Sequence, residues 1–111
     1  MTDQEFSDLA DRTLTDLEDR LNEASADLDM EVEAEGGTIK LLFDDPHPGT
    51  FVLSANPPAK QIWLSALSTS FKFNWSEEKD TFVHEKSGES ISSLIARLIS
   101  EQIGFTRIVT L

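Results

Sequence analysis

Acidic and apolar residues alternate along the segment from Asp27 to Glu35. Because successive side chains of a β-strand point to opposite faces, this alternation predicts a half-buried strand with one apolar face. Its other face carries a carboxylate at every second position: Asp27, Asp29, Glu31, Glu33 and Glu35. The pair Gly36-Gly37 follows and is typical of a two-residue hairpin turn, because such turns need positive φ. We therefore predict an antiparallel hairpin that continues to Phe43.

The turn and the apolar pattern of this hairpin predict the same register. It pairs six apolar residues on one face: Ala34 with Ile39, Val32 with Leu41, and Met30 with Phe43. The same register places Glu33 opposite Lys40, which is a favourable cross-strand pair.

Two segments have the three- and four-residue hydrophobic spacing of an amphipathic helix. The first covers about residues 3–24 and opens on Thr2-Asp3-Gln4-Glu5, a capping box. The second follows the candidate N-cap Ser90 and ends near Gly104. Acidic residues cover the polar faces of the first helix, and three of them share one stripe: Asp16, Asp19 and Glu23. Like charges at this spacing destabilise a helix by about a few tenths of a kcal/mol per pair, so packing must compensate or the charge is used.

Four more strands are expected between the hairpin and the second helix, at about residues 50–55, 60–65, 71–75 and 81–85. Polar and proline-containing turns separate them, including Asp44-Asp45-Pro46-His47-Pro48-Gly49. The apolar tail from Phe105 to Leu111 is expected to pack on the body. The order helix, about six strands, helix predicts one α+β domain over residues 1–111. It is a two-layer sandwich with both helices on one face of an antiparallel sheet.

The outer face of such a sheet must be largely polar and in contact with water. If Ile62 and Leu64 face the core, then Gln61, Trp63 and Ser65 face outward. An exposed tryptophan is a candidate binding anchor, since tryptophan is enriched among interface hot spots. The structural alternative is that Trp63 faces inward or packs beneath lysine and arginine stems.

The chain carries a net charge of −12, concentrated in its first third. Residues 1–35 hold 13 acidic and 2 basic residues, whereas residues 36–111 hold 8 acidic and 7 basic residues. This imbalance argues against nucleic-acid binding, which needs a basic surface. It favours metal cations or basic protein surfaces as partners, and the alternative is a solvated face that confers solubility.

The chain contains no cysteine, which excludes disulfides, thiol catalysis and clusters held by its own thiolates. No apolar run approaches the roughly 20 residues of a membrane-spanning helix, so no membrane association is expected. The acidic start lacks the pattern of a signal or transit peptide, and we expect a cytoplasmic protein.

The segment Asn56-Pro57-Pro58-Ala59-Lys60-Gln61-Ile62-Trp63-Leu64-Ser65 resembles the signature strand of the frataxin family. Three further features resemble that family at the expected positions: the opening Glu5-Phe6-x-x-Leu9-Ala10-Asp11 helix, the acidic strand that ends at Gly36-Gly37, and the Ser87-Gly88-Glu89-Ser90 entry to the last helix. The chain departs from the family at Asn22 and Ser25, where relatives are often acidic. Ser68-Thr69-Ser70 also stands where the family usually has glycine.

The resemblance implies a helix–sheet–helix sandwich that binds Fe²⁺ and Fe³⁺ weakly on an acidic ridge. It implies docking on the cysteine desulfurase and the scaffold protein of iron–sulfur cluster assembly, and regulation of cluster formation. Carried onto this sequence, the acidic ridge comprises Asp11, Asp16, Glu18, Asp19, Glu23, Asp27, Asp29, Glu31 and Glu33. The partner surface centres on Trp63 and Gln61, and the desulfurase would also contact Glu18, Asp19 and Glu23. We expect a monomer, and iron-dependent oligomers are left open.

The residues alone support a shallow metal site. Alternate carboxylates of a strand are about 7 Å apart, which is too far to enclose one ion easily. An enclosed iron site would also use imidazole, and His47 and His84 are better explained as surface or packing residues. A pure interaction protein, whose acids dock on a basic desulfurase surface, is the alternative. No nucleophile–base pair, phosphate loop or di-iron motif is present, so no enzymatic role is expected.

Overall fold

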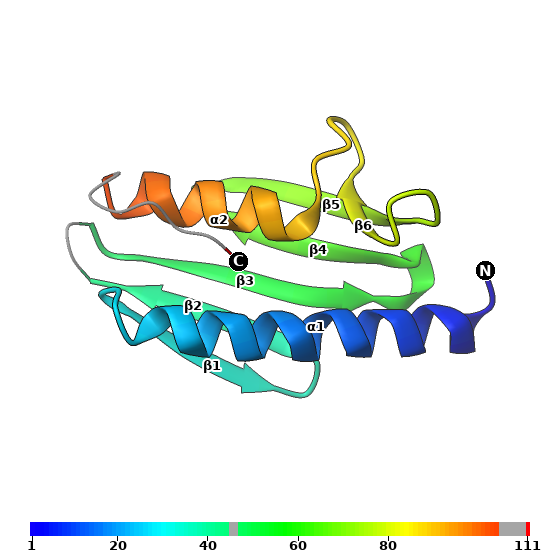
Figure 1. The fold of residues 1–111 in the computed structure, drawn as a ribbon, viewed down its shortest axis with the longest axis horizontal. Helices are drawn as coiled ribbons and strands as arrows, with labels where there is room; N and C mark the ends of the chain where they lie inside the picture. Colours follow the sequence, from blue (N-terminus) through cyan, green and yellow to red (C-terminus); the bar gives the residue numbers. More distant parts are fainter. Residues whose placement is uncertain (45–46, 105–110) are drawn as a thin grey trace.

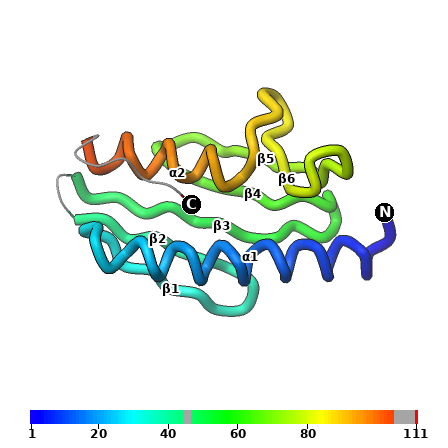
Figure 2. The backbone as a smooth tube through the Cα atoms, in the orientation of Figure 1, coloured from blue at the N-terminus to red at the C-terminus, as the bar shows by residue number. Residues whose placement is uncertain are grey.

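The computed structural model describes residues 1–44, 47–104 and 111. Within them, two helices lie side by side on one face of a six-stranded antiparallel sheet, whose strands follow chain order from β1 to β6 (Figures 1 and 2). The elements are α1 (Asp3–Ser25), β1 (Met30–Glu35), β2 (Thr38–Phe43), β3 (Gly49–Asn56), the 3₁₀ turn η1 (Pro57–Ala59), β4 (Gln61–Ala66), β5 (Thr69–Ser76), β6 (Thr81–His84) and α2 (Ile91–Gln102). This confirms the predicted α+β two-layer sandwich.

The first hairpin has the predicted register. Val32 pairs with Leu41 and Glu33 pairs with Lys40, and β1 forms one edge of the sheet. The predicted start of the strand at Asp27 is wrong, because β1 begins at Met30 and residues 26–29 form the turn after α1. In that turn the backbone N–H groups of Asp27 and its neighbours bond back to α1, so they are not available to β2. Only three of the five alternating carboxylates therefore lie on the strand.

Both helices begin where their capping residues predict. The Thr2 hydroxyl accepts from the backbone N–H of Glu5, and the Glu5 carboxylate accepts from the Thr2 N–H, which completes the capping box of α1. The Ser90 hydroxyl accepts from the Ser93 N–H at the start of α2. These caps satisfy backbone donors that a helix start would otherwise leave without partners.

The core lies between the helices and the sheet. Its largest fully buried side chains come from every layer: Phe6, Leu17 and Leu21 of α1, Phe51, Ile62, Leu64, Phe73 and Phe82 of the sheet, and Ile91, Leu94, Ile95 and Ile99 of α2. Phe6 meets Phe82 edge to face, with ring centroids 6.1 Å apart, so the first turns of α1 pack on the far edge strand β6.

The apolar tail can be assessed only at its last residue. Leu111 is partly buried against the core, whereas the other tail residues lie outside the described part of the chain. No helix in the described ranges is long and apolar enough to span a bilayer.

Candidate metal and partner surfaces

The acidic residues of α1 divide between two flanks of the helix. Asp11 and Glu18 face the β1–β2 hairpin, where they line a groove of about 370 Å³ together with Glu35. The walls are completed by Thr15 and the turn glycines Gly36 and Gly37. Acidic residues of a helix and a strand therefore border one open groove, although they are far apart in the sequence.

Asp16 lies on the opposite flank of α1. It forms an ion pair with Arg20, at 3.2 Å between the Arg20 Nη2 and Asp16 Oδ2 atoms, and lines a second groove toward the start of α2. Arg12 and Arg20 line this groove as well, so both basic residues of α1 lie apart from the hairpin groove. The structure thus separates Asp16 from Asp11 and Glu18.

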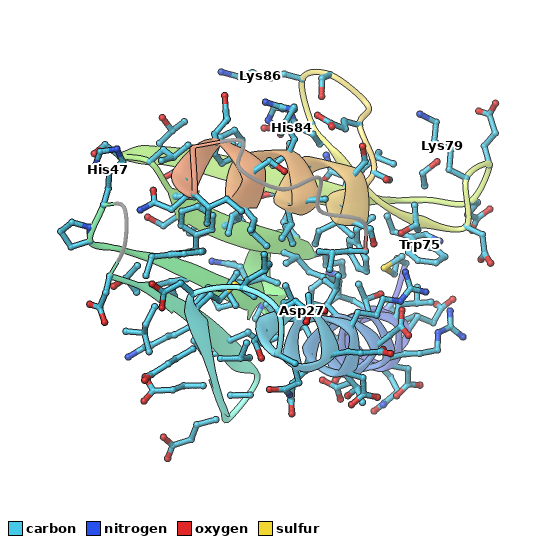
Figure 3. All side chains as sticks on the ribbon, turned by 60° about the vertical axis from the view of Figure 1, so that its left-hand side comes forward. Asp27, His47, Trp75, Lys79, His84 and Lys86 are labelled. Atoms are coloured by element: carbon cyan, nitrogen blue, oxygen red, sulfur yellow. The ribbon has the colours of Figure 1, made fainter. Side chains whose placement is uncertain are left out.

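The remaining residues of the acidic ridge continue from the helix to the edge strand. Asp19, Glu23, Asp27 and Asp29 are exposed along α1 and the turn that follows it. Figure 3 shows Asp27 beside α1, well separated from Lys79 and Lys86 in the loops that flank β6. Glu31 and Glu33 are exposed on the outer face of β1. Glu33 is directly opposite Lys40, which is the first basic residue beside this edge.

These carboxylates do not form an enclosed metal cage. No group of three or more histidine, aspartate or glutamate side chains among the described residues is placed to hold one ion. Carboxylate oxygens suit hard cations, and an open surface leaves such ions most of their water. The chemistry that this arrangement offers is shallow outer-surface binding of cations.

Neither histidine belongs to the acidic ridge. The His84 ring packs against the rings of Phe71 and Phe73, and its Nδ1 atom is 2.9 Å from the Ser87 hydroxyl. His47 is exposed in the β2–β3 connection, far from Asp27 (Figure 3). Its backbone carbonyl accepts a hydrogen bond from Gln102.

Trp63 lies on the outer face of the sheet, as the alternation predicts. It is 37% exposed, while its neighbours Ile62 and Leu64 are buried. Lys72 on β5 lies directly opposite, with its ammonium group 5.1 Å from the centroid of the Trp63 ring. Trp63 therefore faces outward, as the alternation predicts, and it also packs against a lysine side chain, which was part of the alternative interpretation.

The side chain of Gln61 also holds the Trp63 indole in place. Its Nε1–H donates to Gln61 Oε1 over 2.9 Å, and Gln61 Nε2 donates to Asn74 Oδ1 over 3.1 Å and to Glu85 Oε1 over 3.3 Å. Beside the ring lies a depression of about 230 Å³, lined mainly by Val52, Ser54, Ser65, Ser70 and Lys72.

The centre of the sheet differs in charge from the acidic ridge. Residues 46–76, which include β3, β4 and β5, contain no aspartate or glutamate. Lys40 on β2 and Lys72 on β5 are exposed on the outer face, and the carboxylates of β1 lie at its edge. The molecule therefore presents an acidic edge at β1, whereas strands β3, β4 and β5 carry a lysine and an exposed tryptophan but no acidic residue.

The structure adds residues that sequence reasoning did not select. Glu35 is one of the alternating carboxylates, but its place in one groove with Asp11 and Glu18 depends on how α1 crosses the hairpin. Lys72 could have been found from the β4–β5 register, which the alternation of both strands allows. No local sequence pattern indicates a role for Asn74 or Glu85, because that role depends on side-chain hydrogen bonds that link β4, β5 and the residue after β6.

Residues 1–105 match the model of the frataxin-like domain. The iron–sulfur cluster assembly protein CyaY of Pseudomonas putida W619 is 35% identical over 104 residues, covering 94% of this chain and 91% of the relative. CyaY of Pseudomonas fluorescens Pf-5 is 33% identical over 102 residues, covering 92% and 89%.

Solved structures agree with these sequence matches. Frataxin from Psychromonas ingrahamii has the same fold, with a TM-score of 0.81 at 20% identity over 99% of this chain and 96% of that one. Trimeric frataxin from the yeast Saccharomyces cerevisiae, in a crystal structure with ferrous iron, has a TM-score of 0.72 at 29% identity over 86% and 85%. The chain belongs to the frataxin family.

Proposed function

We propose that this protein is a non-enzymatic accessory factor and regulator of iron–sulfur cluster assembly. In this role it binds Fe²⁺ and Fe³⁺ weakly on the acidic ridge and docks on the cysteine desulfurase and its scaffold protein. The relatives named as iron–sulfur cluster assembly proteins and the yeast frataxin crystallised with ferrous iron support the role.

The observation that carries the iron-binding part is the groove between α1 and the first hairpin. Asp11 and Glu18 from the helix and Glu35 from the strand line it together, in an open geometry that admits a hydrated cation. We therefore add Glu35 to the proposed metal residues. Asp16 is the weakest member, because Arg20 already neutralises it on the other flank.

The docking part rests on the division of charge. Asp19 and Glu23 are exposed and Glu18 is partly exposed, which suits a basic surface, whereas Trp63 and Gln61 lie on β4, a strand without acidic residues. Opposite surface potentials speed association and fix the orientation of a complex. One molecule can thus meet two dissimilar partner surfaces at once.

A ¹⁵N-HSQC titration with Fe²⁺ under argon tests the iron-binding proposal. Paramagnetic broadening should begin at residues 11, 18 and 35 and extend over residues 11–35, while Asp16 and the β5–β6 turn respond last. Ridge signals that stay sharp at millimolar iron would leave these acids as a docking or solubility surface. A matched control is the Asp11→Asn/Glu18→Gln/Glu35→Gln variant, in which the first sites to broaden should be lost.

The alternative is an interaction protein whose metal binding is incidental. The Glu18→Gln/Asp19→Asn/Glu23→Gln variant separates the two cases when its affinity for the desulfurase is measured without metal. Binding that is weaker and also less sensitive to salt than that of the natural protein supports electrostatic docking. Unchanged affinity would remove these three residues from the proposed docking surface. Neutralising Glu77 and Glu78 in the β5–β6 turn gives a control that removes two exposed carboxylates away from the acidic ridge.

A further inference from the structure

A series of side-chain hydrogen bonds crosses the outer face of the sheet from β4 through β5 to the residue after β6. It begins at the Trp63 indole N–H on β4, passes through the Gln61 amide, and ends on Asn74 of β5 and Glu85 just after β6. Gln61 uses its oxygen to accept from the indole and its nitrogen to donate to the other two residues. Its amide is therefore fixed in one orientation, because a flipped amide would satisfy none of these partners.

Glu85 also supports Trp63 through the backbone of Lys72. The Glu85 backbone N–H donates to the Lys72 carbonyl over 2.9 Å, which extends the β5–β6 pairing by one residue. Lys72 in turn places its ammonium group over the Trp63 ring. Glu85 thus acts on the indole through the Gln61 side chain and on the strand that carries Lys72.

The stability of the fold does not explain why these exposed side chains are held in one orientation. An exposed tryptophan can satisfy its N–H with water, so stability does not require a chain that ends two strands away. Fixing an exposed ring and an amide loses side-chain entropy. That loss is recovered on binding, because a contact residue that is already oriented has less freedom left to lose.

We propose that Glu85 and Asn74 are positioning residues that hold Trp63, through Gln61, in the orientation used for partner docking. The indole N–H is then occupied within the protein, and the partner meets the edge of the ring, the Lys72 ammonium group and the serine-lined depression beside them. Such a surface suits a partner segment that combines an apolar side chain with a carboxylate. The docking role of Trp63 rests on the proposed function, but its orientation by Glu85 does not.

The experiment follows the indole directly. The two tryptophans give two indole ¹H–¹⁵N signals, assigned with Trp63→Phe, and Trp75 serves as an internal reference because it is half-buried against Phe82. In Asn74→Ala/Glu85→Ala, the Trp63 signal should shift and exchange with solvent faster, while the Trp75 signal stays in place. In Glu85→Gln, which keeps an acceptor oxygen, the Trp63 signal should stay near its original position.

Binding to the cysteine desulfurase is measured on the same variants. Asn74→Ala/Glu85→Ala should weaken it about threefold to tenfold, the effect expected for freeing one or two contact side chains, and Glu85→Gln should restore most of it. An indole signal that does not respond to the double substitution would overturn the positioning role, whatever the binding result. An indole that responds while Trp63→Ala leaves binding unchanged would instead refute the docking role of Trp63. A loss of binding by Glu85→Gln equal to that of the double variant would point to a direct charge contact and also overturn the proposal.

Discussion

The side-chain amide of Gln102 donates a hydrogen bond to the backbone carbonyl of His47 over 2.8 Å. Gln102 is 7% exposed and is the single buried polar side chain in the described ranges, and its bond to His47 is partly shielded from water. A buried amide is destabilising unless it is paired, and this pair joins the end of α2 to the connection before β3. The contact fixes one end of the helical layer on the sheet.

Removing this amide should destabilise the protein measurably. Gln102→Leu keeps the volume but leaves the His47 carbonyl without its partner, and we expect a loss of about 1–2 kcal/mol in unfolding free energy. Urea denaturation followed by circular dichroism measures it. Gln4→Leu is the control, because its amide bonds Asp8 on an exposed part of α1, and its effect should stay within about 0.5 kcal/mol. Equal effects would show that burial of the Gln102 bond does not matter.

Gly49 is the neighbour that this amide most constrains. A Cβ added there would lie 3.0 Å from Gln102 Nε2, and the backbone of Gly49 is outside the positive-φ region. Gly49→Ala should therefore destabilise by about 1 kcal/mol in the natural background but have little effect in Gln102→Ala. A double-mutant cycle from urea titrations measures the coupling. Additive effects would mean that the side chain moves aside without losing its bond.

The β4–β5 turn contains strain that can be relieved. Its two central residues, Leu67 and Ser68, have φ of 51° and 61°, a conformation that favours asparagine and glycine. Leu67 is also 44% exposed, so little packing is lost on replacing it. Leu67→Asn/Ser68→Gly should stabilise the protein by about 1 kcal/mol. Ser70→Gly, placed in the strand β5, should destabilise it, and a stability loss in the turn variant would show that Leu67 contributes packing after all.

The first hairpin shows what local pattern can and cannot predict. Its register followed from alternation and the glycine pair, because a one-residue slip would move every apolar side chain to the wrong face. Alternation alone placed Asp27 and Asp29 on the strand. Continuing the observed register would set Asp29 directly opposite Asp44, and like charges in such pairs repel, so the pairing stops at Met30 and Phe43.

The candidate site was predictable in composition but not in arrangement. Acidic residues, Trp63 and Gln61 were all visible in the sequence. The separation of Asp16 from Asp11 depends on which flank of α1 faces the hairpin, and that is set by packing of the whole helix. Contacts such as Gln61 with Glu85 link residues that are far apart in the sequence, and periodicity carries no information about them.

The Glu89–Arg97 pair should make a small pH-dependent contribution to stability. Arg97 Nη2 donates to Glu89 Oε1 over 2.9 Å, and this bond lowers the pKa of Glu89 against the opposing effect of partial burial. A carboxylate whose pKa is lowered by folding stabilises the protein above its unfolded pKa of about 4.3, and the contribution is lost as the pH falls through the lower folded value. Arg97→Met should therefore cost about 0.5 kcal/mol near neutral pH, and the difference from the natural protein should vanish in acid. Melting curves recorded from neutral pH to acid measure this difference in stability. The control is Lys86→Met, because Lys86 has no ion pair in the described part of the structure, and it should show no such pH dependence.

Divalent cations should stabilise the folded protein more than salt does. Two unit charges about 7 Å apart in water repel by roughly 0.6 kcal/mol, and the acidic ridge repeats such pairs, so an ion bound between them relieves repulsion that exists mainly in the folded state. Millimolar Ca²⁺ or Mn²⁺ should raise the melting temperature more than NaCl of equal ionic strength, which acts only by screening.

The excess shift should disappear in Asp11→Asn/Glu18→Gln/Glu35→Gln, because these residues share the groove beside the hairpin. It should persist in Glu77→Gln/Glu78→Gln, where the carboxylates lie in the β5–β6 turn. Equal shifts with both salts would mean that the ridge responds to ionic strength alone, and an excess that survives the groove substitutions would place the cations elsewhere on the surface.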